Sequence, residues 1–129
     1  MNSRILVVED NPINQKVTML TLNRFRNDSD LAENGEAAVH ACQAHRYGLV
    51  LMDCRMPVLN GFEATKQIRA LCTPQPIIIA LTANCTEAAK EQCFESGMDH
   101  YVSKPVRPDH LQSLLRQALD ADLIVRAAA

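Results

Sequence analysis

The sequence predicts an α/β protein: a five-stranded parallel sheet with helices on both faces. Short apolar runs alternate with longer amphipathic stretches five times along the 129 residues. The runs Ile5-Leu6-Val7-Val8 and Leu49-Val50-Leu51-Met52 are apolar throughout, as in strands that are buried on both faces. Strand–helix alternation of this kind is typical of parallel strands joined by right-handed crossovers.

Five strands and five helices are expected along the chain. The strands are expected at residues 4–8, 28–32, 48–53, 77–82 and 100–103. The helices are expected at residues 12–26, 36–45, 61–71, 85–96 and 108–120. Pro12 suits the first turn of the first helix, whereas polar residues at 28–30 make the second strand the least apolar. Asn34-Gly35 predicts a turn before the second helix.

Local signals also mark the elements of the second half. Asn60 is the expected N-cap of the third helix, with Glu63 three residues further on. Prolines separate this helix from the fourth strand, whose core is a run of isoleucines. Gly97 is the expected C-cap of the fourth helix, and Pro108 opens the fifth.

The bulk composition indicates one domain over residues 1–129, with a core at about 4–120 and a tail at 121–129. A net charge of −2 does not favour direct binding to nucleic acid or to a membrane surface. The chain contains neither a signal-peptide pattern nor an apolar stretch of the ~20 residues that a membrane span needs, so a cytoplasmic location is expected. Five cysteines without zinc-like spacing favour reduced thiols that fill core or helix positions.

Polar side chains follow four of the expected strands. Glu9 and Asp10 follow the first strand, Asp53 ends the third, Thr82 ends the fourth and Lys104 follows the fifth. Each residue alone is more often a solvated loop residue, a cap or an ordinary strand residue. Because the carboxyl ends of parallel strands meet at one edge of a sheet, their coincidence predicts a single site.

The residue types at this edge indicate a divalent cation and a phosphoryl group. Close carboxylates repel one another unless a cation compensates, and Mg²⁺ favours carboxylate and phosphate oxygens. The Asp53 carboxylate would be the nucleophile toward phosphorus. Lys104 and the Thr82 hydroxyl would neutralise and hold the phosphoryl oxygens.

These residues and their neighbours resemble the receiver domain of two-component response regulators. The resemblance covers about residues 4–120. Within the family, the sequence is most similar to the receivers of hybrid sensor kinases. It is carried by Ile5-Leu6-Val7-Val8-Glu9-Asp10-Asn11, Val50-Leu51-Met52-Asp53-Cys54-Arg55-Met56-Pro57, Asn60-Gly61, Ala80-Leu81-Thr82-Ala83 and Ser103-Lys104-Pro105. The fold that it implies is a flavodoxin-like doubly wound sheet with strand order 2-1-3-4-5 and five helices.

The resemblance implies that Asp53 accepts a phosphoryl group from the phosphohistidine of a histidine kinase or histidine phosphotransfer domain. Asp10, Asp53 and the backbone carbonyl of Arg55 would bind Mg²⁺, with Glu9 acting largely through water. The domain would then be a switch that assists its own phosphorylation and dephosphorylation rather than an enzyme with turnover. The sequence leaves open whether it is a stand-alone regulator or the receiver of a hybrid sensor kinase.

The resemblance also implies a switch and a partner surface. Thr82 would move toward the phosphoryl group, and the aromatic ring of Tyr101 would turn into the vacated space. Ile13 and Val17 lie one turn apart on the first helix. If exposed, they would form with Pro105 and Val106 an apolar surface for a phosphotransfer domain; the alternative is that Val17 is a core residue.

Two other functions would use a similar strand-end site, and each would need residues that this chain lacks there. A Mg²⁺-dependent phosphohydrolase would need a general acid near the nucleophile, typically a second aspartate two residues on, where this chain has Arg55. A flavodoxin-like cofactor binder would need a hydroxyl- or glycine-rich phosphate loop after the first strand, where Glu9-Asp10 would repel a flavin phosphate.

Overall fold

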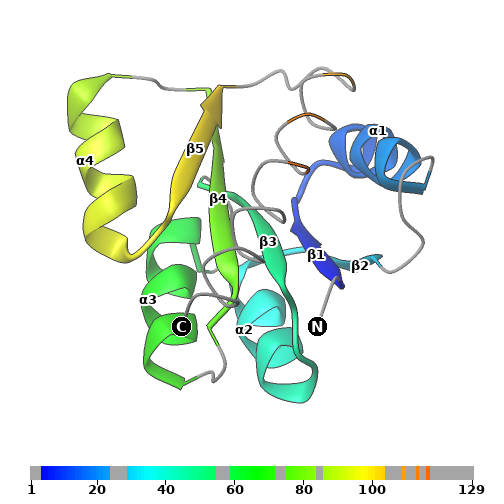
Figure 1. The fold of residues 1–129 in the computed structure, drawn as a ribbon, viewed down its shortest axis with the longest axis horizontal. Helices are drawn as coiled ribbons and strands as arrows, with labels where there is room; N and C mark the ends of the chain where they lie inside the picture. The colour runs from blue at the N-terminus through cyan, green and yellow to red at the C-terminus, as the bar shows by residue number, and fades with distance from the viewer. Residues whose placement is uncertain are drawn as a thin grey trace.

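A computed structural model describes residues 4–23, 29–54, 59–71, 75–83 and 86–103, together with the helical positions 109, 113 and 116. Its five parallel strands lie in the order β2-β1-β3-β4-β5, as predicted (Figure 1). The strands are β1 (Ile5–Val8), β2 (Ser29–Ala32), β3 (Leu49–Asp53), β4 (Ile77–Thr82) and β5 (His100–Ser103). The helices are α1 (Pro12–Asn23), α2 (Gly35–Ala44), α3 (Gly61–Leu71) and α4 (Glu87–Ser96). The expected fifth helix falls mostly outside the described residues.

Alternate residues of the central strands face opposite sides of the sheet. Leu6, Val50 and Ile78 pack in one hydrophobic cluster with residues of α2, α3 and α4. Their neighbours on the same strands pack in a second cluster, to which Leu22 of α1 belongs. Successive strand side chains point to opposite faces, so a strand covered on both sides must be apolar at every position. This explains the uninterrupted apolar runs from which the parallel sheet was predicted.

The helix ends agree closely with the sequence signals. The side chain of Asn60 accepts a hydrogen bond from the Glu63 amide at 3.0 Å, which confirms the predicted N-cap of α3. Gly97 adopts a left-handed conformation with φ of 108° and closes α4 as predicted. The side chain of Asn34 accepts from the Ala37 amide at 2.8 Å. The turn expected before the second helix is therefore the N-cap itself, and α2 begins one residue earlier than predicted.

Arg69 ties three elements together at the end of the sheet where β4 begins. Its guanidinium donates to the carbonyl oxygens of Gly97 at 2.8 Å and Pro76 at 2.7 Å. It also forms an ion pair with Asp99 at 2.7 Å. The Asp99 carboxylate in turn accepts the backbone N–H of Ile78 at 2.8 Å. These contacts join the end of α3 to the start of β4 and the end of α4.

A second polar cluster joins the first three strands. The Asp30 carboxylate of β2 accepts from the hydroxyl of Tyr47 at 2.6 Å and from Arg4 Nε at 2.8 Å. The Tyr47 hydrogen bond lowers the pKa of Asp30, partial burial opposes this effect, and Arg4 lowers the pKa further. Burial, followed by the bond to Asp30, raises the pKa of Tyr47. The cluster explains how a strand as polar as β2 is held at the edge of the sheet.

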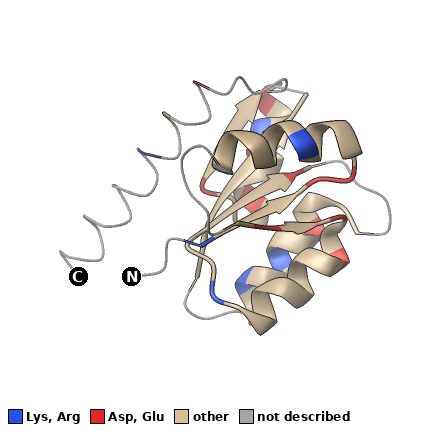
Figure 2. Cartoon of the chain, turned by 90° about the vertical axis from the view of Figure 1, so that its right-hand side faces the viewer, with Lys and Arg blue, Asp and Glu red and all other residues tan. Residues whose placement is uncertain are grey.

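The cysteines that the structure describes are placed as their spacing predicted. Cys42, Cys54 and Cys93 are buried and form no disulfide, as predicted, while Cys72 and Cys85 lie outside the described residues. Of the described helices, α3 and α4 carry both acidic and basic residues, whereas α1 has only Lys16 and α2 only Glu36 (Figure 2). None of the helices that the structure describes is both long enough and apolar enough to span a membrane.

Candidate functional site

Three carboxylates meet at the carboxyl ends of β1 and β3. One carboxylate oxygen each from Glu9, Asp10 and Asp53 lies within 4.8 Å of the other two. Val8 pairs with Met52 in the parallel register, so the next residue on each chain segment, Glu9 and Asp53, reaches the same edge. Glu9 and Asp53 are 2% and 3% exposed, whereas Asp10 is exposed. The structure therefore brings together the three acids predicted to form the site.

This set of donors fits a hard divalent cation. Two nearly buried carboxylates carry a large desolvation cost unless positive charge or hydrogen bonds compensate. An oxygen-only set with one solvent-facing member suits Mg²⁺, which binds through one or two carboxylates and keeps several waters. The other predicted ligand, the backbone carbonyl of Arg55, lies outside the described residues, and so does Lys104.

Thr82 lies at the same edge, one strand further along. Asp53 pairs with Leu81, and the Cys54 amide donates to the Leu81 carbonyl at 3.1 Å, so Thr82 is the next residue beyond this pair. Thr82 is only 7% exposed. The register therefore places Thr82 at the same strand end as the predicted acceptor, on the adjacent strand.

Gly61 permits α3 to start directly beside the end of β3. A Cβ atom on Gly61 would lie 2.3 Å from the backbone oxygen of Asp53 and 2.9 Å from the Cα of Cys54. The Gly61 amide donates to the Cys54 carbonyl at 3.2 Å across this close approach. The sequence indicated Gly61 only as part of a motif, whereas the structure gives it a packing role next to the site.

Three hydrogen bonds to Glu9 hold the turn that carries Glu9 and Asp10. The Glu9 amide donates to the Ala32 carbonyl of β2 at 3.1 Å. The Asn11 amide donates to the Glu9 carboxylate at 3.2 Å. The side-chain amide of Gln15 donates to the backbone carbonyl of Glu9 at 2.7 Å. No role was predicted for Gln15 from the sequence; it lies on α1, on the opposite side from Ile13 and Val17.

Tyr101, the predicted switch residue, is half-buried on the edge strand β5. It pairs with Ala80, two residues before Thr82 on β4. The Nζ atom of Lys90 lies 5.1 Å from the centroid of the Tyr101 ring, and the Phe94 ring packs edge-on at 6.2 Å. The hydrogen bond to Tyr101, followed by the contact with Glu87, raises the pKa of Lys90. Lys90 and Phe94 were missed in the sequence, where only their i, i+4 spacing on α4 could have marked them.

The predicted partner surface is exposed where it is described. Ile13 is 73% exposed and Val17 is 46% exposed, so Val17 is not a core residue. Leu20, one turn further along α1, is 55% exposed and continues the same face. The expected contributions of Pro105 and Val106 lie outside the described residues.

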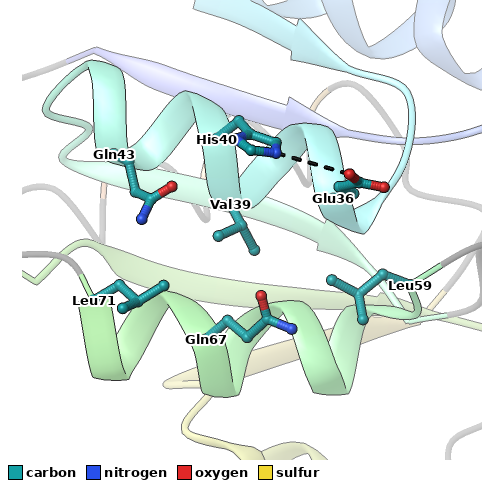
Figure 3. A pocket seen from close by; sticks show the side chains of 7 residues that line it. All are labelled: Glu36, Val39, His40, Gln43, Leu59, Gln67 and Leu71. Atoms are coloured by element: carbon teal, nitrogen blue, oxygen red, sulfur yellow. Dashed lines mark ion pairs between the residues drawn. The ribbon is translucent and has the colours of Figure 1, made fainter.

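A separate groove of about 390 Å³ lies between α2 and α3 (Figure 3). His40 and Glu36 form an ion pair at 3.8 Å on its α2 side. The groove is lined by Glu36, Val39, His40, Gln43, Leu59, Gln67 and Leu71. It contains none of the residues predicted for the site, so the strand-end acids and this groove are distinct features.

Residues 5–116 match the family described as the response regulator receiver domain. The chain belongs to this family, whose members are signalling switches of two-component and phosphorelay systems. The matched range spans all three strand-end acids and Thr82.

The individual relatives include a hybrid signal transduction protein and a histidine kinase. The chain is 42% identical over 120 residues to the hybrid signal transduction protein dokA of Dictyostelium discoideum, covering 92% of this chain and 7% of that protein. It is 36% identical over 143 residues to histidine kinase 5 of Arabidopsis thaliana, covering 90% of this chain and 16% of that protein. The chain thus spans only a small part of the curated relatives it matches.

Solved structures of receivers have the same fold. The receiver domain of sensor histidine kinase PA1611 from Pseudomonas aeruginosa is 39% identical, with a TM-score of 0.84 over 93% of this chain and 99% of that one. That structure contains a magnesium ion in its active-site cleft. The receiver domain of Saccharomyces cerevisiae Ssk1, solved with the phosphotransfer protein Ypd1, is 33% identical, with a TM-score of 0.84 over 90% and 88% of the chains.

Proposed function

We propose that this domain is a phosphorylation-dependent switch whose acceptor is Asp53 and whose phosphorylation requires Mg²⁺. The observation that carries the proposal is the meeting of Glu9, Asp10 and Asp53 at the strand ends. The magnesium ion in the similar receiver of PA1611 supports the same assignment. On this proposal residues 1–129 are one receiver domain with its core at about 4–120, and it works in the cytoplasm.

In the proposed reaction an oxygen of the Asp53 carboxylate attacks the phosphorus of a phosphohistidine. The new O–P bond forms as the P–N bond breaks, and the histidine nitrogen keeps the electron pair of the broken bond. When bound, Mg²⁺ offsets the negative charge of the carboxylates and the phosphoryl oxygens. Asp10, Asp53 and the Arg55 carbonyl would hold the ion directly, and Glu9 would act through water.

Thr82 and Lys104 complete the proposed site. Thr82 would donate a hydrogen bond from its hydroxyl to one phosphoryl oxygen, and the Lys104 ammonium would bind another. Thr82 would shift toward the phosphoryl group, and the Tyr101 ring would turn inward to fill the space left behind. That rotation would remove the ring from Lys90 and Phe94 and change the face formed by α4 and β5.

The proposed partner is a histidine kinase or a histidine phosphotransfer domain. The Ssk1 receiver was solved with Ypd1, which is a histidine phosphotransfer protein, and this supports a partner of the same kind for this chain. The exposed apolar residues of α1 would receive it, together with Pro105 and Val106. Relatives such as the much longer hybrid signal transduction histidine kinase K of Dictyostelium discoideum favour a receiver that is part of a longer kinase, with a stand-alone regulator as the alternative.

Mass spectrometry after incubation with Mg²⁺ and a small phosphodonor tests the acceptor. The wild-type chain and the exposed control Asp109→Asn should each gain one phosphoryl group, and Asp53→Asn should gain none. Chelation of Mg²⁺ should abolish the gain. A gain that persists in Asp53→Asn would exclude Asp53 as the acceptor. Sustained turnover of a small phosphate ester, instead of a single labelling event, would favour the phosphohydrolase.

A further inference from the structure

Glu9, Asn11 and Gln15 form a closed circuit of hydrogen bonds between the acidic turn and α1. The Asn11 amide donates to the Glu9 carboxylate at 3.2 Å. The Gln15 amide donates to the Asn11 carbonyl at 2.9 Å. The Gln15 side chain then donates to the Glu9 carbonyl at 2.7 Å and closes the circuit. We propose that Gln15 is a positioning residue that sets the geometry of the cation site and thereby its preference for Mg²⁺.

The bond from Gln15 acts on both acids of the pair. The Glu9 carbonyl belongs to the peptide unit that joins Glu9 to Asp10, and this unit is planar. Fixing its oxygen therefore fixes the plane from which the Asp10 side chain departs. On the other side of Glu9, its amide is bonded to Ala32 of β2 at 3.1 Å. The main chain of Glu9 is thus held between a strand and a helix, which limits rotation of the acidic turn.

Gln15 is itself held firmly by the start of α1. The side chain of Asn11 accepts from the amides of Ile13 at 2.9 Å and Asn14 at 3.2 Å, which caps the helix. Gln15 is half-buried, on the opposite side of α1 from exposed Ile13 and Val17. A short bond from a capped helix to the turn can therefore transmit the placement of α1 to the carboxylates.

Geometry matters more for Mg²⁺ than for Ca²⁺. Mg²⁺ demands a near-ideal octahedral arrangement with short ligand distances, whereas Ca²⁺ accepts more variable distances and angles. Outer residues that orient metal ligands typically change metal affinity by about 10–100-fold when they are removed. Loss of the Gln15 bond should therefore weaken Mg²⁺ binding more than Ca²⁺ binding. A residue that only stabilises the fold would not change the ratio of the two affinities.

Calorimetric titration of the full chain with Mg²⁺ and with Ca²⁺ tests this inference, which rests on the proposed cation site. Gln15→Leu removes the donor, and Gln43→Leu, an exposed glutamine on α2, is the matched control. Gln15→Glu keeps the shape of the side chain but replaces the donor by an acceptor. Its added negative charge acts on both ions, so the affinity ratio remains the readout if Gln15→Leu folds poorly. Thermal unfolding reports the effect of each variant on stability.

We expect Gln15→Leu to weaken Mg²⁺ binding by about tenfold, near the lower end of the range for outer residues, and Ca²⁺ binding clearly less. Gln15→Glu should lower the same ratio, and Gln43→Leu should leave it at the wild-type value. An unchanged ratio in both Gln15 variants would overturn the positioning role while leaving the cation site intact. Failure of the wild-type chain to bind Mg²⁺ would instead overturn the cation site, and the role of Gln15 with it.

Discussion

Asp30 shows how one carboxylate can hold an otherwise polar edge strand in place. Its bonds to Tyr47 and Arg4 keep its pKa below the ordinary value for aspartate. A folded-state pKa below the unfolded value means that the contribution of Asp30 to stability is complete above about pH 4. As the pH falls from there through the folded-state pKa, that contribution is lost. The side chain is 36% exposed, so solvent screening keeps its effect modest.

Asp30→Asn is therefore expected to destabilise the protein in a pH-dependent manner. At pH 7 the free energy of unfolding should fall by about 1 kcal/mol, because charged hydrogen bonds to Arg4 and Tyr47 become neutral ones. The difference from wild type should shrink between pH 7 and pH 3. Urea unfolding at the two pH values measures it, with Glu95→Gln as an exposed control. An equal difference at both pH values would contradict the assigned role.

The site residues that could be predicted from the sequence are those with a recognisable local sequence context. An acid or a hydroxyl at the end of an apolar run is visible in the sequence, and Glu9, Asp53 and Thr82 do lie at one edge. Gln15 and Asp30 were not selected for any role, because their partners are set by the way a helix or a strand packs. Asp30, for example, meets Tyr47 from 17 residues away.

At the scale of whole elements, the start of α3 packs in close backbone contact with the end of β3. Alanine is intrinsically better than glycine in a helix by about 1 kcal/mol, so propensity alone would favour Gly61→Ala. The added Cβ would meet backbone atoms of Asp53 and Cys54, which cannot rotate away. We expect the clash to prevail and the variant to lose about 1–3 kcal/mol of stability.

Thermal or urea unfolding checks the prediction for Gly61→Ala. Gln67→Ala, at an exposed position on the same helix, controls for the general effect of alanine. Since the clash lies on the backbone of Asp53, Mg²⁺ affinity should fall with stability. A higher melting temperature in Gly61→Ala would mean that α3 can shift away from β3 without cost.

Element boundaries were predictable where local signals dominate and less so where packing decides. The caps at Asn60 and Gly97 are local, and both were predicted from the sequence. The start of α2 differed because Asn34 caps the helix directly, which makes the predicted turn part of the helix start. The strand β2 was the weakest prediction, because polar residues at 28–30 dilute its apolar content; in the structure Asp30 bonds to Tyr47 and Arg4.

For the whole molecule, the sheet order and the presence of a strand-end site could be predicted before the structure. Two-sided burial requires apolar strands, and the resemblance to receivers implied the order that the structure has. Exposure could not be predicted in the same way. The spacing of Ile13 and Val17 fits a buried face as well as a docking surface, and the structure leaves both residues exposed.

The exposed face of α1 leads to a prediction about recognition by another molecule. Ile13→Asp should slow phosphoryl transfer from a histidine phosphotransfer domain that phosphorylates the wild-type chain, by about tenfold, because a charge would have to be desolvated in the contact. Labelling by a small phosphodonor should stay at the wild-type rate. Leu71→Asp, which alters an exposed leucine on α3, serves as the control. Equal transfer rates for Ile13→Asp and wild type would rule out α1 as the docking surface.

The contacts of Arg69 also determine how α4 can move. Gly97 and Asp99, directly after α4, are fastened by Arg69 to α3 and to the start of β4. The other end of the helix, at Thr86, lies on the side of the sheet where β4 ends at Thr82. A helix that is fixed at one end moves least there and most at its opposite end. We therefore expect any displacement of α4 to be smallest near Gly97 and greatest near Thr86, on the side of the strand-end acids.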